Sequence, residues 1–333
     1  MAKIIFELTN LCNFSCTHCI RDEEGPKHYL DPELVEQVLE QAQAYGDFDF
    51  VAMTGGEPTL HPEFGRIVAS IAEAGFPYGF VTNGWQFDKT LRQIEPHLDR
   101  LRNINFSLDG AREETHDTLR RREGSFRRII KAISRCRFLG LPVHINMVVT
   151  TANRNELEEM AVLASRLGCE ALGYGHCQPT PDGLAAELVP SLTERRAIEG
   201  EVAALQEIFQ LDIAFAGDHY SPSLFYQCPQ LRMEELNIDY RGYLTACCTL
   251  SNYRGGQPDT DVVADLAEVG LFEGHRRLVS KIAEVNREKL ARLEGGATRE
   301  ADHFICTHCL EHYDKVGDLE SALNPKLVQI GAR

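Results

Sequence analysis

Strand-like and helix-like segments alternate along roughly the first 215 residues of this 333-residue chain. This alternation favours parallel strands joined by crossover helices, the arrangement of α/β proteins. Six repeats fall short of the eight that close a full barrel. We therefore predict an α/β fold, a partial (β/α)6 barrel, with strands at 3–8, 48–53, 78–82, 104–108, 143–149 and 171–175.

Capping residues mark the helices between these strands. Asp31 before Pro32 suits the start of a helix, and a glycine suits the end of one. The barrel helices are expected near 61–74, 88–97, 125–139 and 155–167. Further along the chain we expect a long helix at about 192–210, a hairpin at 237–248 and a charged helical stretch at about 262–294.

Chemically distinctive residues follow the first four strands. In α/β folds of this kind, ligands bind at the carboxyl ends of the strands. The residues there are Cys12, Cys16 and Cys19, then Gly55-Gly56-Glu57-Pro58, then Asn83-Gly84, then Ser107-Leu108-Asp109-Gly110. The sequence therefore predicts one site at this edge of the sheet.

The net charge of −16 disfavours nucleic acid as a partner, because phosphate binding needs clustered Lys and Arg. The short basic run Arg120-Arg121-Arg122, with Arg127 and Arg128 nearby, is either a solvated helix face or a site for an anionic group. No apolar stretch reaches about 18 residues, so no membrane span is expected. The N-terminus, MAKIIFELTN, lacks the pattern of a signal peptide, and we expect a cytoplasmic protein.

Eleven cysteines in a reducing compartment are more typical of ligands than of disulfides. They gather at 12–19, 228–248 and 306–309. Cys136 and Cys169 stand apart and are expected to be small buried hydrophobic residues. Cys177 also stands apart, just beyond the last expected barrel strand, at the mouth of the barrel.

The first cysteine group has the spacing CxxxCxxC, with Cys12, Cys16 and Cys19 on a loop after a strand. Cysteine thiolates hold iron–sulfur clusters, and three of them leave one iron of a 4Fe–4S cluster open to another ligand. A structural zinc site is the alternative, because zinc takes four closed ligands. His18 could supply the fourth, although its place next to Cys19 would strain such a site.

The motifs that accompany these cysteines resemble the radical SAM (S-adenosylmethionine) superfamily. The order is CNFSCTHC, TGGEP, VTNG and SLDG, followed by His116, Asp117, Arg120 and Gly124-Ser125-Phe126. In that family, the open iron binds the amine and carboxylate of SAM, and one electron cleaves the sulfonium bond. The resemblance implies that a 5′-deoxyadenosyl radical then abstracts hydrogen from a substrate.

The resemblance also implies which residues bind SAM. The backbone of Gly55-Gly56-Glu57-Pro58 would hold the methionyl amine, and the set continues with Asn83, Ser107, Asp109, Arg120 and, on the fifth strand, Asn146 and Val148. Two positions depart from the family pattern. His18 replaces an aromatic residue that lies near adenine, and it can still stack. Arg121 stands where a glycine usually follows the arginine.

The C-terminal cysteines Cys228, Cys247, Cys306 and Cys309 resemble those of a twitch domain, a shortened SPASM domain that holds an auxiliary 4Fe–4S cluster. The shared pattern includes IDxxGxxxxC at Ile238–Cys247 and a late CxxC. A zinc site of four cysteines is the alternative. We therefore expect two domains, a radical SAM partial barrel at 1–215 and a small α+β cluster-binding domain at 216–333.

Four thiolates would close every iron of this second cluster, which leaves electron transfer or structure as its use. The resemblance thus favours an oxidation, either a dehydrogenation or an oxidative bond formation. The alternative is an epimerase in which Cys248 or Cys177 donates hydrogen to a substrate radical. A third alternative is a non-catalytic zinc-binding protein.

The expected substrate is a polar small molecule, such as a sugar or aminocyclitol, or a peptide. A role in natural-product biosynthesis is among the expectations. About ten residues precede Cys12, too few for the leader-binding domain of many peptide-modifying relatives, and this tilts the expectation toward a small molecule. A flavodoxin- or ferredoxin-type reductant is implied by the mechanism.

Overall fold

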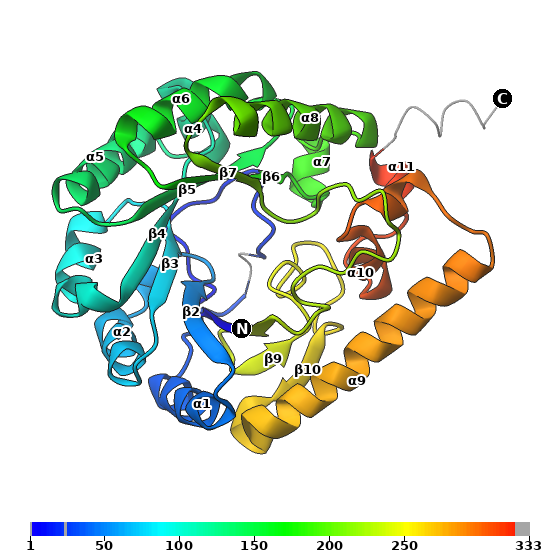
Figure 1. Ribbon diagram of the computed structural model, residues 1–333, viewed down its shortest axis with the longest axis horizontal. Helices are drawn as coiled ribbons and strands as arrows, with labels where there is room; N and C mark the ends of the chain where they lie inside the picture. Colours follow the sequence, from blue (N-terminus) through cyan, green and yellow to red (C-terminus); the bar gives the residue numbers. More distant parts are fainter. Residues whose placement is uncertain (1, 23–24, 324–333) are drawn as a thin grey trace.

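The computed structural model describes residues 2–22 and 25–323 (Figure 1). Six parallel strands pair in chain order, as predicted. They are β1 (Ala2–Glu7), β2 (Phe48–Thr54), β3 (Tyr78–Thr82), β4 (Leu101–Ser107), β5 (Val143–Val149) and β6 (Ala171–His176). The strands form an arc around a central space, with helices outside it (Figure 1).

Helices cover the arc, and those with a predicted range lie close to it, whereas the helices at 113–120 and 181–185 were not predicted. The helices are α1 (Pro32–Tyr45), α2 (Phe64–Glu73), α3 (Phe87–Ile94), α4 (Glu113–Arg120), α5 (Ser125–Phe138), α6 (Leu157–Leu167) and α8 (Leu192–Ile208), with a short α7 (Pro181–Ala185) between the last two. Asp31 accepts a hydrogen bond from the backbone N–H of Glu33, so it caps α1 as expected. No helix among the described residues is both long enough and apolar enough to cross a bilayer.

Four further strands extend the same sheet at both edges. β7 (Asp212–Phe215) pairs in parallel with β6, and β8 (Glu235–Ile238) pairs in parallel with β1. β9 (Tyr243–Thr245) is antiparallel to β8, which completes the predicted hairpin, and β10 (Val262–Asp265) follows it. The resulting sheet has ten strands in the order β10-β9-β8-β1-β2-β3-β4-β5-β6-β7.

We expected the stretch 262–294 to be helical, but it is not helical throughout. It begins with the strand β10, and only then does α9 (Leu266–Glu294) start, capped by Asp265. Val262-Val263-Ala264 is short and apolar enough to join the sheet edge beside β9. The chain ends its described part with α10 (Thr307–His312) and α11 (Leu319–Leu323).

The faces of the strands divide the core from the site. Along β5, Val143, Ile145, Met147 and Val149 are buried against the helices, whereas the alternate residues are only partly buried. Because side chains alternate along a strand, Asn146 and Val148 face the interior of the arc. A second, smaller apolar cluster around Tyr253, Phe304 and Tyr313 supports the C-terminal cysteines.

Candidate active site

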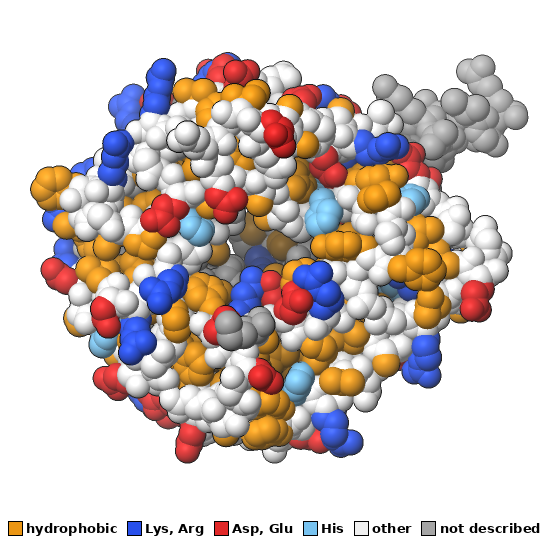
Figure 2. Space-filling model, in the orientation of Figure 1, with side chains coloured by type: hydrophobic (Ala, Val, Ile, Leu, Met, Phe, Trp, Pro, Cys, Tyr) orange, Lys and Arg blue, Asp and Glu red, His pale blue; other side chains and the backbone are white. Residues whose placement is uncertain are grey.

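A pocket of about 1180 Å³, counted with its open mouth, lies at the carboxyl ends of the strands. We call this pocket the central pocket. Its lining includes Cys16, His18, Cys19, Gly55, Gly56, Ser107, Arg120, Asn146 and Val148 from the barrel, with Asp218, Thr249 and Cys306 from later in the chain. Figure 2 shows the molecule hollowed near the middle of this view. A smaller pocket that adds Cys12, Glu57 and Asn83 shares Cys16, Cys19 and Arg120 with it.

All three cysteines of the first group line these pockets, and each sulfur accepts a hydrogen bond. The backbone N–H of Phe14 lies 3.5 Å from the Sγ of Cys12, and that of Arg21 lies 3.4 Å from the Sγ of Cys19. Nη1 of Arg120 lies 3.8 Å from the Sγ of Cys16. N–H donors of this kind stabilise thiolate ligands of an iron–sulfur cluster. The loop therefore fits a cluster held by three thiolates.

The surroundings of Cys12 and Cys16 favour the neutral form of their metal-free thiols. Burial, followed by the nearby Glu57 carboxylate, raises the pKa of Cys12 to about 12, and burial raises the pKa of Cys16 to about 11. Metal ligands must be deprotonated, so metal binding here releases protons.

Gly55 and Gly56 let the loop after β2 run against the cysteine loop. A Cβ on Gly55 would lie 2.4 Å from the carbonyl oxygen of Thr9, and a Cβ on Gly56 would lie 2.3 Å from that of Leu11. Gly55 also has a φ of 129°, which side chains disfavour. The N–H groups of Gly56 and Glu57 donate to the carbonyls of Thr9 and Leu11 at 2.7 and 2.8 Å. Close approach of two backbones thus explains both glycines.

Glu57 ties the loop after β2 to the end of β3 through its side chain. Its carboxylate accepts hydrogen bonds from the hydroxyls of Thr59 and Thr82 at 2.6 and 2.8 Å and from the N–H of Asn83 at 2.7 Å. Pro58, which opens a short 3-10 helix (Pro58–Leu60), is buried and is not among the lining residues of either pocket.

Asp109 does not face the central pocket, although we had placed it near the ribose and carboxylate of SAM. It is fully buried. Its carboxylate pairs with Arg120 at 2.5 Å and with His18 at 3.0 Å, and accepts the N–H of Val148 at 2.9 Å. Burial opposes the charge, but Arg120 and then His18 hold the pKa of Asp109 well below its usual range. Asp109 therefore orients three residues that do line the pocket.

The motif around α4 builds the corner that holds Arg120. Nδ1 of His116 accepts the backbone N–H of Asp109 at 3.0 Å. Asp117 accepts hydrogen bonds from the N–H of Gly124, the hydroxyl of Ser125 and the N–H of Phe126, at 2.6, 2.7 and 2.8 Å, and so caps α5.

Arg121, the departure from the family pattern, ends α4 in the left-handed conformation that a glycine would favour, with φ 51° and ψ 40°. The backbone geometry of the corner is therefore kept without the glycine.

Asn83, Ser107 and Asn146 lie in the pockets as the resemblance implied. The amide of Asn83 donates to Asn13 at 2.8 Å and accepts the N–H of Trp85 at 3.0 Å. Gly173 on β6 makes room for Asn146, because a Cβ there would lie 2.4 Å from the Oδ1 of Asn146.

The four C-terminal cysteines line one small pocket. Cys228, Cys247, Cys306 and Cys309 surround it together with Leu231, Leu250, Ile282, Leu310 and Tyr313. The N–H of Thr249 lies 3.3 Å from the Sγ of Cys247, and the N–H of Cys306 donates to Asp218 at 3.1 Å. Thr249 and Cys306 also line the central pocket, so the two pockets share a wall.

Neither cysteine group forms a site for a single metal ion in this structure. Across residues 2–22 and 25–323, no three His, Cys, Asp or Glu side chains are arranged to hold one. The apolar surroundings of the four C-terminal thiols, and the absence of any other ionisable side chain from that pocket's lining except Tyr313, fit a buried iron–sulfur cluster.

The two candidate hydrogen donors lie outside the central pocket. Cys177 is fully buried with Leu119 and Leu188, and burial raises its pKa to about 12. Its predicted place at the mouth of the barrel is therefore wrong for the side chain, because the thiol points into this apolar cluster. Cys248 is half-buried and lines neither the central pocket nor the pocket of the four cysteines.

Sequence reasoning missed a buried joint between the two cysteine loops. The carboxylate of Glu7 accepts hydrogen bonds from Asn237 at 2.9 Å and Ser251 at 3.1 Å, and pairs with Arg21 at 3.1 Å. Arg21 also donates to the carbonyl of Ser251. The available signal was a glutamate at the end of an otherwise apolar strand, since buried charges are paired.

Comparison with known proteins agrees with this geometry. A model of the radical SAM superfamily matches residues 6–164. A probable GTP 3′,8-cyclase of Saccharolobus solfataricus is 33% identical over 184 residues, which are 54% of this chain and 58% of the cyclase. AlbA, the antilisterial bacteriocin subtilosin biosynthesis protein of Bacillus subtilis, is 30% identical over 171 residues, 51% of this chain and 38% of AlbA. The chain thus spans about half the length of these relatives.

The fold of the whole chain also has a solved counterpart. The structure of anSMEcpe with bound AdoMet and Cp18Cys peptide aligns with a TM-score of 0.66 and 13% identity, covering 99% of this chain and 98% of that one. The segment matched by the family model contains the CxxxCxxC loop, the Gly55-Gly56-Glu57-Pro58 turn and the α4 corner. The family match thus places residues 6–164 of the chain in the radical SAM superfamily.

Proposed function

We propose that this protein cleaves SAM at a cluster held by Cys12, Cys16 and Cys19, abstracts a hydrogen atom from its substrate, and oxidises that substrate through an auxiliary cluster held by Cys228, Cys247, Cys306 and Cys309. The observation that carries the oxidation is the shared wall. Thr249 and Cys306 line both the central pocket and the pocket of the four cysteines.

When bound, a 4Fe–4S cluster on the first cysteine loop would supply the electron that cleaves SAM to a 5′-deoxyadenosyl radical. The chain's own residues orient SAM. An ammonium group needs acceptors, and the carbonyl groups of Gly55 and Gly56, which line both pockets, would offer them, whereas those of Glu57 and Pro58 already accept the N–H groups of Leu60 and His61. Arg120 offers its guanidinium to the carboxylate of SAM.

His18, Asn146 and Val148 form the adenine and ribose end of the proposed SAM site. All three line the central pocket. His18 is held in place by Asp109, which makes Asp109 a positioning residue rather than a direct contact of SAM. This assignment keeps His18 as the planar side chain that stacks on adenine.

The auxiliary cluster gives the oxidation its electron acceptor. The substrate would lose a hydrogen atom to the deoxyadenosyl radical, and then one electron to the auxiliary cluster and one proton to solvent, a net two-electron oxidation. Cys228, Cys247, Cys306 and Cys309 would hold that cluster, and with four protein ligands it would leave no position for the substrate. The domains proposed at 1–215 and 216–333 would then each hold one cluster, the second in the manner of a twitch domain.

The substrate proposed is a polar small molecule or a peptide side chain. AlbA takes part in the biosynthesis of a bacteriocin and the Saccharolobus relative is a probable GTP cyclase, so both classes occur among the relatives. A flavodoxin- or ferredoxin-type protein would supply the electron in a cytoplasmic setting.

The first experiment counts iron and acid-labile sulfide after anaerobic reconstitution. A variant with Cys12, Cys16 and Cys19 all changed to Ala should keep about four irons per chain, and so should the complementary variant that lacks the four C-terminal cysteines. Near-zero iron in the first variant, with zinc in its place, would make the C-terminal site structural and shift the reaction to a redox-neutral one.

An epimerase remains the second candidate, on the observation that Cys248 lies next to the ligand Cys247 and beside Arg21 of the central pocket. Turnover in D2O separates the two, because a thiol donor exchanges with water. Oxidation predicts a product without solvent deuterium. One deuterium per product, lost in Cys248→Ala, would establish the epimerase instead.

A further inference from the structure

We propose that a basic surface around Trp85 is the docking site of an acidic one-electron carrier protein that reduces the cluster on the first cysteine loop. This inference rests on the proposed function, since it names the partner that starts the reaction. We call the surface formed by Trp85, Arg122, Arg128, Lys89 and Lys131 the Trp85 surface.

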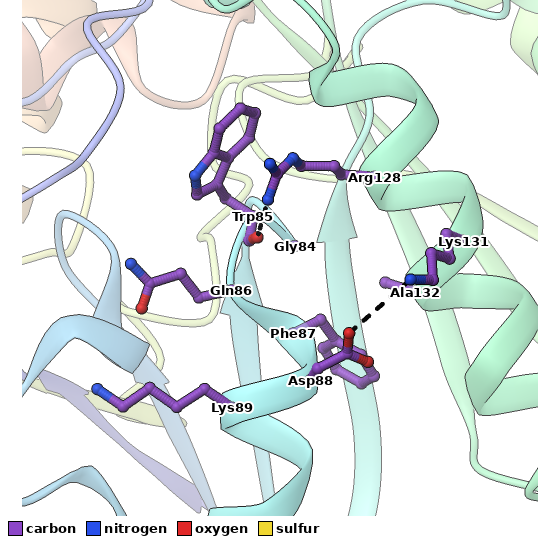
Figure 3. A pocket seen from close by; sticks show the side chains of 9 residues that line it. All are labelled: Gly84, Trp85, Gln86, Phe87, Asp88, Lys89, Arg128, Lys131 and Ala132. Atoms are coloured by element: carbon purple, nitrogen blue, oxygen red, sulfur yellow. Dashed lines mark hydrogen bonds and ion pairs between the residues drawn. The ribbon is translucent and has the colours of Figure 1, made fainter.

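Trp85 is the chain's single tryptophan, and two arginines stack on it. The guanidinium of Arg122 lies 4.3 Å from the ring centroid and that of Arg128 lies 3.9 Å from it. Arg128 also lies 3.4 Å from the carbonyl oxygen of Trp85 (Figure 3). Stacking on an aromatic ring holds an arginine in one place at little entropic cost. The two charges are thus pre-positioned at the surface.

The charges of this surface are available to a partner. Arg122 and Arg128 are exposed, and neither pairs with a carboxylate among residues 2–22 and 25–323. Lys131 is only loosely paired, since its Nζ lies 4.0 Å from Asp88. Figure 3 shows Arg128, Lys131 and Lys89 around a hollow between α3 and α5, which Gly84 to Lys89 line on one side.

The net charge of the whole chain makes this surface selective. A chain of net charge −16 repels an acidic protein over most of its surface. A local concentration of unpaired arginine reverses that sign at one place, and complementary charge of this kind steers encounter and orientation. The partner that fits is therefore an acidic protein.

An aromatic pair leads from this surface to the first cysteine loop. The ring of Phe14 meets Trp85 edge-on, with centroids 5.6 Å apart and planes at 78°. Phe14 stands between Cys12 and Cys16 in the chain, and its N–H lies 3.5 Å from the Sγ of Cys12. It also lines the pocket that holds the three thiols. A carrier seated on Trp85 would thus deliver its electron where the cluster is bound.

Because the cluster takes up one electron, the carrier must deliver electrons singly. A flavodoxin hydroquinone anion gives up one electron and becomes the neutral semiquinone, while the cluster is reduced by that one electron. Such encounters are transient and use small interfaces. A surface of a few exposed arginines around one half-buried ring suits such an encounter better than a large apolar face would.

The test is a charge reversal with a matched control. Arg122→Glu with Arg128→Glu changes the net charge by −4 at the Trp85 surface. Arg102→Glu with Arg166→Glu makes the same change at two exposed residues with no ion pair among those described, one at the start of β4 and one in the last turn of α6. Both lie at the end of the barrel away from the cysteine loop.

Cluster reduction is followed by stopped-flow absorbance and EPR, with a bacterial flavodoxin hydroquinone or with dithionite as reductant. In the wild type, the flavodoxin rate should fall as salt is added. The Trp85-surface variant should lose a factor of ~10 or more at low ionic strength and most of its salt dependence. The control variant should keep the wild-type rate, and dithionite should reduce all three proteins equally.

Binding gives a readout that does not depend on the cluster. Oxidised flavodoxin should bind the metal-free wild type and the control variant. It should bind the Trp85-surface variant at least tenfold more weakly, which corresponds to a loss of ~1.4 kcal/mol of binding free energy. The milder pair Arg122→Gln with Arg128→Gln, which cannot repel a partner, should lie between.

Three outcomes would overturn the inference. The first is an unchanged flavodoxin rate and affinity in the Trp85-surface variant. The second is a parallel loss of dithionite reduction in that variant, which would mean a damaged cysteine loop. The third is salt-sensitive binding of single-stranded DNA as strong as that of flavodoxin, which would mean a general anion surface. If the wild type holds no reducible cluster on the first loop yet flavodoxin binding depends on Arg122 and Arg128, the proposed function fails and the docking site stands.

Discussion

Asp109 pairs with two side chains of the site, although it does not itself line the central pocket. It is fully buried, and both of the side chains that pair with it, Arg120 and His18, face the pocket. Removing one member of a buried ion pair leaves the other charge without compensation. The consequences of this arrangement can be measured on stability and on SAM binding separately.

We predict that Asp109→Asn lowers the free energy of unfolding by about 3–5 kcal/mol and weakens SAM binding, because Arg120 and His18 lose their common anchor. Urea denaturation measures the first effect and calorimetry of SAM binding the second. Asp88→Asn is the control, since Asp88 is exposed and pairs loosely with Lys131, and it should change stability by less than ~0.5 kcal/mol. Equal effects of the two changes would contradict the role of Asp109.

His116 should make stability depend on pH. Burial, followed by Arg120, lowers its pKa to about 4, so the unfolded chain binds the proton more readily than the folded one. The contribution of neutral His116 is full above the unfolded pKa of ~6.5 and is lost as the pH falls toward 4. Between pH 7 and 4.5, the wild type should lose roughly 2–3 kcal/mol more stability than His116→Asn. Urea midpoints at both pH values measure this, and parallel curves would refute it.

Spacing and residue type predicted most of the pocket lining, but not the direction of each side chain. The three thiols, Gly55, Gly56 and Arg120 line the pockets, because short motifs place them after a strand end. Asp109 and Cys177 turn away from the central pocket, since a motif does not specify which residues of other segments a side chain packs against or pairs with. The same holds for Glu7, whose partners Asn237 and Ser251 are more than two hundred residues away.

At the scale of elements, the corner between α4 and α5 carries the only departure from the family pattern that affects the backbone. Arg121 takes a left-handed conformation there, and Asp117 caps the next helix. The two residues should respond in opposite directions to substitution.

We predict that Arg121→Gly keeps or raises stability, by up to ~1 kcal/mol, because glycine adopts a positive φ without steric cost. Asp117→Ala should lower stability by about 1–2 kcal/mol through loss of the cap. Thermal unfolding of both variants beside the wild type measures the pair. A loss in Arg121→Gly as large as that in Asp117→Ala would show that the arginine side chain, and not the backbone, holds the corner.

The elements of the barrel were predictable because each is periodic over its own length. β3 and β5 coincide with the predicted ranges, and α5 and α6 differ from them by a residue or two. β10 was missed, because three apolar residues and an aspartate before a charged helix look like its first turn. The parallel pairing of β8 with β1 could not be foreseen, since it joins segments more than two hundred residues apart and no local pattern encodes that register.

At the scale of the whole molecule, the pairing of β8 with β1 joins the two proposed domains in one sheet. β8 lies on β1, and the buried Glu7 carboxylate is satisfied only by groups from both sides, namely Arg21, Asn237 and Ser251. Unfolding the C-terminal part alone would expose an edge of β1 and leave Glu7 buried with fewer donors. Both consequences are costly.

We therefore predict that the two parts unfold together, although the family relationship treats them as separate modules. In metal-free chain, Trp85 fluorescence reports the barrel, and pulsed alkylation of Cys306 and Cys309 reports the C-terminal part. The two probes should give the same urea midpoint. Asn237→Ala should separate them, with alkylation moving to lower urea, because it removes a donor that Glu7 receives across the junction. If the wild type already shows alkylation at lower urea than the Trp85 transition, the shared sheet does not couple the parts, and the auxiliary cluster would have to be positioned against the central pocket by its own local contacts alone.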